Sequence, residues 1–117
     1  MEVNLVIRQK VFDFEKNMYG YLSKYPRHER LTLVAETKNT IHRINRQLSR
    51  AAKAEKKRAM LYDADAELDL LKHLVELGYE LHYLSKTGHQ VCMIQLAEIG
   101  KMLGGWIGSI KNKKEDN

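Results

Sequence analysis

Apolar residues recur at alternating steps of three and four along most of the chain, and this spacing constrains the fold more than any other feature. The clearest run lies near the C-terminus: Cys92, Leu96, Ile99, Leu103, Trp106 and Ile110. Residues three and four apart share one face of an α-helix, so each run can bury one side of a helix. The chain also has a single proline, Pro26. Long helices are favoured over strands, and the predicted fold class is all-α.

Four helices are predicted, at about residues 2–24, 27–52, 63–84 and 88–111. Pro26 ends the first, because proline suits a helix start but not a helix interior. Asp63 and Asp65 are expected at the start of the third, where carboxylates meet free backbone N–H groups. Thr87 is expected to cap the fourth, with Gln90 completing a capping box. Short links then predict one domain over residues 1–111, an antiparallel up-down four-helix bundle, with a disordered tail over residues 112–117.

The third and fourth predicted helices carry more surface for close packing than one bundle needs, and the first has a wide apolar surface. In the first, Leu5, Phe12, Tyr19 and Leu22 form a second apolar stripe. The third also has two stripes and is expected to be buried on two sides. On the fourth, glycines at steps of four suggest close approach of another helix, from the same bundle or from a neighbouring subunit. We therefore expect a homo-oligomer, whose number of copies periodicity alone does not give. The expected interface residues are Leu70, Leu74, Leu77, Leu81, Gly100, Gly104 and Gly108.

Positive charge is concentrated on the second predicted helix and its exit. The chain has a formal net charge of +5, whereas residues 27–58 hold ten basic and three acidic residues. On a helical wheel most of these cations lie opposite the apolar stripe of Val34, Ile41 and Leu48. The candidate phosphate contacts are Lys38, Arg43, Arg46, Arg50, Lys53 and Lys57. Such a ridge can bind a phosphate backbone, but an ordinary solvated helix face has the same pattern. Because no aromatic residues alternate with these cations, backbone contact is expected rather than base recognition.

The sequence offers little for catalysis or for metal binding. Cys92 is the only cysteine, which excludes an internal disulfide and a cysteine-based zinc site, and its place on an apolar stripe predicts a buried side chain. His73 and Glu76 have the i, i+3 spacing of a bundle metal site, but no second pair repeats it. The acidic cluster at residues 63–69 is explained more simply by helix-start electrostatics. We expect a non-enzyme with no metal and no cofactor. A metal-dependent enzyme is an alternative, and of the functions considered the sequence supports it least.

No targeting or membrane segment is expected. The apolar run at residues 3–7 is too short for a signal peptide and is followed at once by Arg8 and Lys10. No stretch of about 18 uncharged apolar residues is present. A cytoplasmic protein without membrane contact is therefore expected.

Three segments together resemble a known family. They are residues 25–31 (YPRHERL), 61–66 (LYDADA) and 97–107 (AEIGKMLGGWI). They are similar to the accessory variability determinant (Avd) proteins of diversity-generating retroelements, part of a wider four-helix group first noticed in ribosomal-RNA intervening sequences. The similarity covers nearly the whole chain, and the last two segments are its more specific part.

The resemblance implies that the four-helix bundle assembles as a barrel-like homo-oligomer, a homopentamer. It also implies that the protein binds a reverse transcriptase and its template RNA or cDNA, supports mutagenic cDNA synthesis and has no catalytic residues of its own. It also implies a nucleic-acid contact at Lys72. One turn further on, Glu76 stands where a second basic residue would strengthen that surface, which shifts weight to the second helix. The alternative is an interaction protein of the intervening-sequence branch with no retroelement partner. A preference for RNA or for DNA does not follow from the sequence.

Overall fold

A computed structural model describes residues 3–113 and contains four long helices. They are α1 (Val3–Leu22), α2 (Ala35–Lys53), α3 (Arg58–Glu80) and α4 (Lys86–Lys113), and two short helical turns, η1 (Arg27–Glu29) and η2 (Arg30–Val34), precede α2. Within this part of the chain there is no strand. The predicted all-α class is therefore confirmed.

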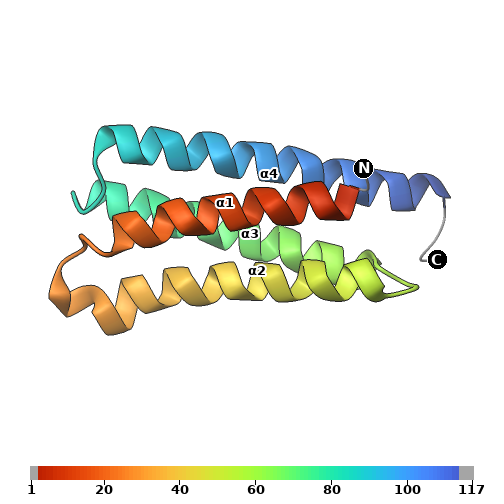
Figure 1. The fold of residues 1–117 in the computed structure, drawn as a ribbon, viewed down its shortest axis with the longest axis horizontal. Helices are drawn as coiled ribbons and strands as arrows, with labels where there is room; N and C mark the ends of the chain where they lie inside the picture. The colour runs from red at the N-terminus through yellow and green to blue at the C-terminus, as the bar shows by residue number, and fades with distance from the viewer. Residues whose placement is uncertain (1–2, 114–117) are drawn as a thin grey trace.

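Successive long helices run in opposite directions along an elongated bundle of 46 × 25 × 21 Å (Figure 1). Each helix packs against two neighbours: α2 against α3, α3 against α4, α4 against α1, and α1 against α2. This is the predicted antiparallel four-helix arrangement. The contact between α1 and α2 is the sparsest of the four, so these two helices leave an open seam between them.

The predicted apolar stripes form one continuous core. All six members of the α4 stripe are buried, including Cys92 and Trp106, as predicted. Ile7, Phe14 and Met18 of α1 are also fully buried. In the other α1 stripe, Leu5, Phe12 and Tyr19 remain exposed, whereas Leu22 is buried. Burying a side chain of this size contributes about 1.5–3 kcal/mol, so the core stripes account for the pairing of the helices.

The third helix begins five residues earlier than predicted. It starts at Arg58, and its first turn has no acidic residue. Leu61 is fully buried, so the helix must already be formed there to carry this side chain into the core. Asp63 and Asp65 therefore lie beyond the first turn, exposed to solvent, and do not cap the helix.

The fourth helix is longer than predicted at both ends. It starts at Lys86, and the Ser85 hydroxyl accepts a hydrogen bond from the Gly88 backbone N–H at 3.0 Å. Ser85, not Thr87, therefore caps this helix. The helix continues to Lys113, so residues 112–113 are helical rather than part of a disordered tail. The remainder of the predicted tail, residues 114–117, lies outside the described residues.

The second helix is not the uninterrupted helix that was predicted. After Pro26 the chain forms a 3₁₀ turn, η1, and then a π-helical turn, η2. The Glu29 carboxylate accepts hydrogen bonds from the Thr32 hydroxyl and from the Leu33 N–H, which fixes this irregular start. These hydrogen bonds, with one from the Tyr83 hydroxyl, lower the pKa of Glu29.

The third helix ends at Glu80, four residues before its predicted end. His82 has a φ of 66°, in the left-handed region. The His82 N–H donates to the Tyr79 carbonyl and the Tyr83 N–H to the Gly78 carbonyl, both at 2.9 Å. These two hydrogen bonds define a Schellman motif, in which glycine is the usual left-handed residue.

We expect His82→Gly to raise the free energy of unfolding by roughly 1 kcal/mol, because glycine adopts this conformation without the steric cost of a Cβ. His73→Gly is the matched control: His73 is also exposed but lies inside α3. There glycine should lower stability by about 1 kcal/mol. Urea unfolding followed by circular dichroism measures both, and a destabilising His82→Gly would contradict the assignment of the motif.

Gly78 makes room for a buried tyrosine from another part of the chain. A Cβ at position 78 would lie 2.2 Å from the Tyr25 hydroxyl oxygen and 3.0 Å from its Cζ. Tyr25 is buried, and its hydroxyl has no hydrogen-bond partner among the described residues. Burial raises the pKa of Tyr25 to about 12. The absence of a side chain at Gly78 therefore lets α3 lie against the turn that precedes α2.

We expect Gly78→Ala to lower the free energy of unfolding by about 1–3 kcal/mol, because the methyl group would overlap the Tyr25 ring. Tyr25→Phe removes the closest atom and should recover part of this loss. A double-mutant cycle measured by chemical denaturation gives the coupling. Additive effects of the two changes would show that the contact does not exist.

Candidate nucleic-acid interface

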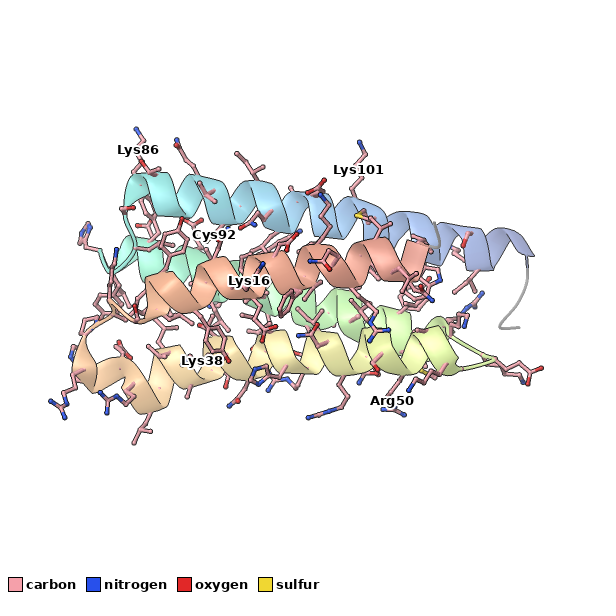
Figure 2. The ribbon with its side chains drawn as sticks, in the orientation of Figure 1. Lys16, Lys38, Arg50, Lys86, Cys92 and Lys101 are labelled. Carbon is pink, nitrogen blue, oxygen red and sulfur yellow. The ribbon has the colours of Figure 1, made fainter. Side chains whose placement is uncertain are left out.

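Three cations of the predicted ridge lie free on the outward face of α2. Arg46, Arg50 and Lys53 are exposed, and none of them forms an ion pair within residues 3–113. Arg50 extends away from the bundle, whereas Lys86 and Lys101 extend from α4 on the opposite side (Figure 2). The spacing of four and three places the three α2 cations on one side of the helix. This side is directly available to a polyanion.

Lys38 continues this face toward the start of α2. It is half-buried, and its Nζ lies 4.5 Å from the centre of the Tyr19 ring. Lys38 also lines a hollow of about 600 Å³ together with Arg27 and Arg30. The turn before α2 thus adds two exposed arginines that the site prediction did not include.

Arg43 does not belong to the free ridge. Its Nε lies 2.9 Å from the Glu67 carboxylate of α3, and its Nη2 lies 3.2 Å from the Glu36 carboxylate. The hydrogen bond to Glu67 is the main cause of a raised Arg43 pKa. Arg43 is half-buried in these contacts, so it joins two helices rather than facing a ligand.

Lys57 also has a structural role. Its Nζ donates hydrogen bonds to the Ala51 carbonyl at 2.7 Å and to the Ala54 carbonyl at 2.6 Å. A cation at a helix C-terminus satisfies unpaired carbonyls and interacts favourably with the helix dipole. The side chain therefore closes the end of α2, and its charge is directed at the protein.

Lys72 lies on a part of the surface that does not favour phosphate. It is half-buried on α3, close to Gly100 of α4. The outer face of α3 is acidic, with the exposed residues Asp63, Asp65, Asp69 and Glu80. Like charges disfavour a polyanion there. The free cations of the predicted ridge lie instead on α2.

The predicted oligomer-interface residues are leucines on α3 and at its C-terminal end, and glycines on α4. Leu77 and Leu81 are 38% and 42% exposed and Leu70 is partly exposed, whereas Leu74 is buried in the subunit's own core. A Cβ on Gly104 or on Gly108 would meet no atom within 4 Å, and one on Gly100 would touch Leu68 and Lys72 at 3.5 Å. Leu70 and Leu74 thus pack within the single subunit, whereas Leu77, Leu81 and the helix surface at Gly104 and Gly108 remain partly open.

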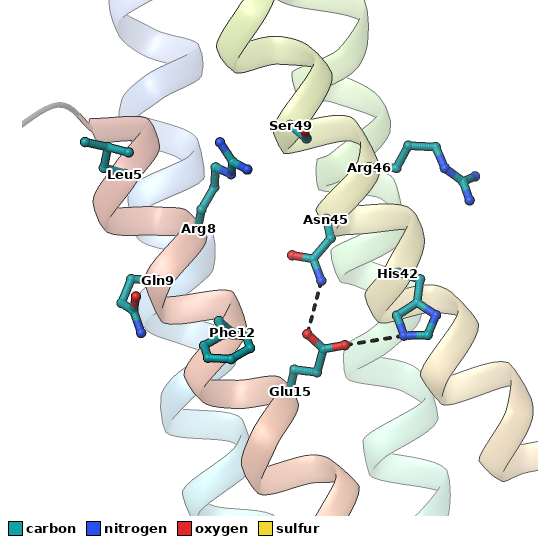
Figure 3. A pocket seen from close by; sticks show the side chains of 9 residues that line it. All are labelled: Leu5, Arg8, Gln9, Phe12, Glu15, His42, Asn45, Arg46 and Ser49. Carbon is teal, nitrogen blue, oxygen red and sulfur yellow. Dashed lines mark hydrogen bonds and ion pairs between the residues drawn. The ribbon is translucent and has the colours of Figure 1, made fainter.

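A groove of about 630 Å³ lies along the seam between α1 and α2 (Figure 3). Phe12 and Arg8 enter it from α1, and Arg46 borders it on α2. The Glu15 carboxylate crosses the seam to His42 and to the Asn45 amide, each at 3.3 Å. Polar pairs of this kind hold the helices together without closing the surface. The spacing of Leu5, Phe12 and Tyr19 at steps of seven was the signal in the sequence for this exposed row.

The remaining candidates for chemistry are held in ordinary contacts. Burial raises the pKa of the Cys92 thiol to about 11, and its Sγ lies 3.8 Å from the Met18 sulfur. Glu76 hydrogen bonds at 2.8 Å to His89 of α4. Among the described residues, no group of three or more His, Cys, Asp or Glu side chains could hold a metal ion. In the same part of the chain, no helix has the length and apolar character needed to cross a bilayer.

Comparison with known families matches residues 5–110 to the family described as bAvd-like. The match extends from the first turn of α1 almost to the end of α4. Among curated proteins, none matches the chain.

We expect replacement by alanine at Arg43 to affect mainly stability, and at Arg50 to affect mainly nucleic-acid binding. Arg43→Ala should lower the free energy of unfolding by up to about 1 kcal/mol, through loss of the pairs to Glu36 and Glu67, and leave nucleic-acid affinity nearly unchanged. Arg50→Ala should weaken binding and leave stability unchanged. Thermal melts and fluorescence anisotropy with a labelled RNA measure the two effects. If Arg43→Ala weakened binding as much as Arg50→Ala, the division of the ridge would be wrong.

Proposed function

The chain belongs to the bAvd-like family, which makes it an Avd-type accessory protein, and from this premise we propose that it binds nucleic acid through the outward face of α2. In this role it supports a reverse transcriptase that copies template RNA into mutagenic cDNA in a diversity-generating retroelement. The bundle contributes binding rather than catalysis. The proposal rests on one observation: three exposed cations on α2 form no ion pair with any residue that the structure describes.

Backbone contact follows from the chemistry of these side chains. Each phosphate neutralised by Arg46, Arg50 or Lys53 releases counterions, so the affinity falls as salt rises. Guanidinium groups also form paired hydrogen bonds with phosphate oxygens. The outer face of α3 is acidic, so this attraction is weak there. Phosphates carry no sequence information, so the contact serves many templates.

We further propose that copies of the subunit assemble into a barrel-like homopentamer. The exposed Leu77 and Leu81 side chains and the open surface at Gly104 and Gly108 support a contact between copies. Assembly would repeat the α2 face around an axis and add the phosphate contacts of several subunits. Linked sites bind with a much higher overall affinity than single ones. The reverse transcriptase is the expected protein partner.

The family match supports this interpretation over the alternative of an intervening-sequence interaction protein without a retroelement. A reverse-transcriptase gene adjacent to the gene for this chain would agree with the proposal. Its absence would favour the alternative.

Charge reversal on α2 tests the proposal. We expect the double change Arg46→Glu and Arg50→Glu to weaken RNA binding at least tenfold at low salt and to flatten the dependence of affinity on salt, because two phosphate contacts are lost. Lys86→Glu with Lys101→Glu makes the same charge change on α4 and is the matched control. Circular dichroism should show unchanged helicity in both.

Anisotropy titrations over a range of salt concentrations give the affinities. If the α2 and α4 variants lost affinity equally, net charge rather than the α2 face would govern binding. Unchanged affinity in the α2 variant at low salt would refute the proposed interface.

A further inference from the structure

Two exposed aromatic rings lie beside the basic face of α2. Phe12 is 51% exposed and Tyr19 is 37% exposed. They are seven residues apart on α1, which is close to two helical turns, so they share one side of the helix about 10 Å apart. Both face the seam with α2: Phe12 lines its groove, and the Tyr19 hydroxyl lies 3.0 Å from His42 Nε2. The sequence did not reveal this arrangement, because the rings and the cations belong to different helices.

Each ring already lies next to a lysine. The Nζ of Lys16 is 5.1 Å from the centre of the Phe12 ring, and that of Lys38 is 4.5 Å from the centre of the Tyr19 ring. An ammonium group over an aromatic face is held weakly at an exposed site. A flat ligand can therefore displace it, and the flexible lysine can then pair with an anion beside the ring.

The cations line both sides of the seam. Arg8 extends from α1 into the gap between the helices, and Arg46 borders the same groove on α2, with its guanidinium group directed toward the outer side of α2 (Figure 3). At the other end, Lys38, Arg27 and Arg30 line the hollow next to Tyr19. The row of exposed rings and apolar side chains from Leu5 to Tyr19 spans about 21 Å, calculated from the rise of 1.5 Å per residue.

One carboxylate lies within the first groove. Among the described residues, Glu15 is the only acidic one that lines it, and its two oxygens are engaged by His42 and Asn45. Both partners belong to α2, and their contacts hold the carboxylate in place. Its negative charge is set against the cations Arg8 and Arg46, which line the same groove.

From this arrangement we propose that the α1–α2 seam binds single-stranded nucleic acid, with bases stacked on Phe12 and Tyr19 and phosphates paired with Lys38 and Arg46. This inference rests on the proposed function and specifies which class of nucleic acid the protein binds. Stacking needs unpaired bases, and it is sequence-tolerant because every base has a flat face. A duplex can offer the same phosphates to α2 but keeps its bases paired. The seam therefore favours a single strand over a duplex of equal charge.

The test compares the affinities for a labelled oligouridine and for an RNA duplex of the same length, at one salt concentration. Phe12→Leu with Tyr19→Leu removes both rings and keeps apolar side chains. We expect it to weaken oligouridine binding about tenfold or more, because stacking contributes about that much per base, and to leave duplex binding and the salt slope unchanged. Phe12→Tyr with Tyr19→Phe keeps both rings and should bind both ligands within about twofold of the unmodified protein.

The outcomes separate this inference from the proposed function. The stacking role would be overturned if the leucine variant bound oligouridine as tightly as the unmodified protein does. It would also be overturned if that variant lost as much affinity for the duplex as for oligouridine. Either result would leave the proposed role of the α2 face intact. A changed native mass of the leucine variant without RNA would assign the seam to contact between copies and also overturn it. If the unmodified protein bound neither ligand, the proposed function itself would fail. Both variants change exposed side chains, and thermal melts verify that they fold.

Discussion

The amphipathic character of α2 is the constraint on which the rest of the molecule depends. Its apolar stripe is narrow, with Ile41, Ile44 and Leu48 at its centre, and these side chains are buried only when α1 and α3 pack against α2. Burial of that stripe directs the opposite side of the helix to solvent. Arg46, Arg50 and Lys53 lie on that side. The interaction that forms the core thus also creates the basic surface, and the same helix links folding to binding.

The two helices that flank α2 differ in how they meet it. On the α3 side, Arg43 joins Glu67, so cations and carboxylates neutralise one another across the contact. On the α1 side, the sparser contact leaves Phe12 and Tyr19 exposed next to Lys38 and the α2 cations. A ligand with both negative charge and flat apolar surface matches the α1 side of α2 and not the α3 side. This asymmetry limits the candidate site to the α1–α2 half of the bundle.

The sequence predicted the helices and their core faces well, because burial follows the spacing of apolar residues directly. It misplaced the ends of helices, because single hydrogen bonds determine where a helix begins or ends. The Ser85 cap of α4 and the left-handed conformation of His82 after α3 are local features that do not appear in the spacing of apolar residues. Within the ridge, the sequence could not distinguish the free cations Arg46 and Arg50 from Arg43 and Lys57, which pair with carboxylates or with backbone carbonyl groups. Those partners lie elsewhere in the chain, and only the packed structure brings them together.

Lysine footprinting shows which face of the bundle RNA covers, without any change to the protein. The accessible lysines are acetylated with and without a short RNA, and the modified sites are measured by mass spectrometry. If RNA binds along α2, it should protect Lys38 and Lys53 and leave Lys86 and Lys101 on α4 as reactive as before. Protection of the α4 lysines, with Lys38 and Lys53 unchanged, would contradict it.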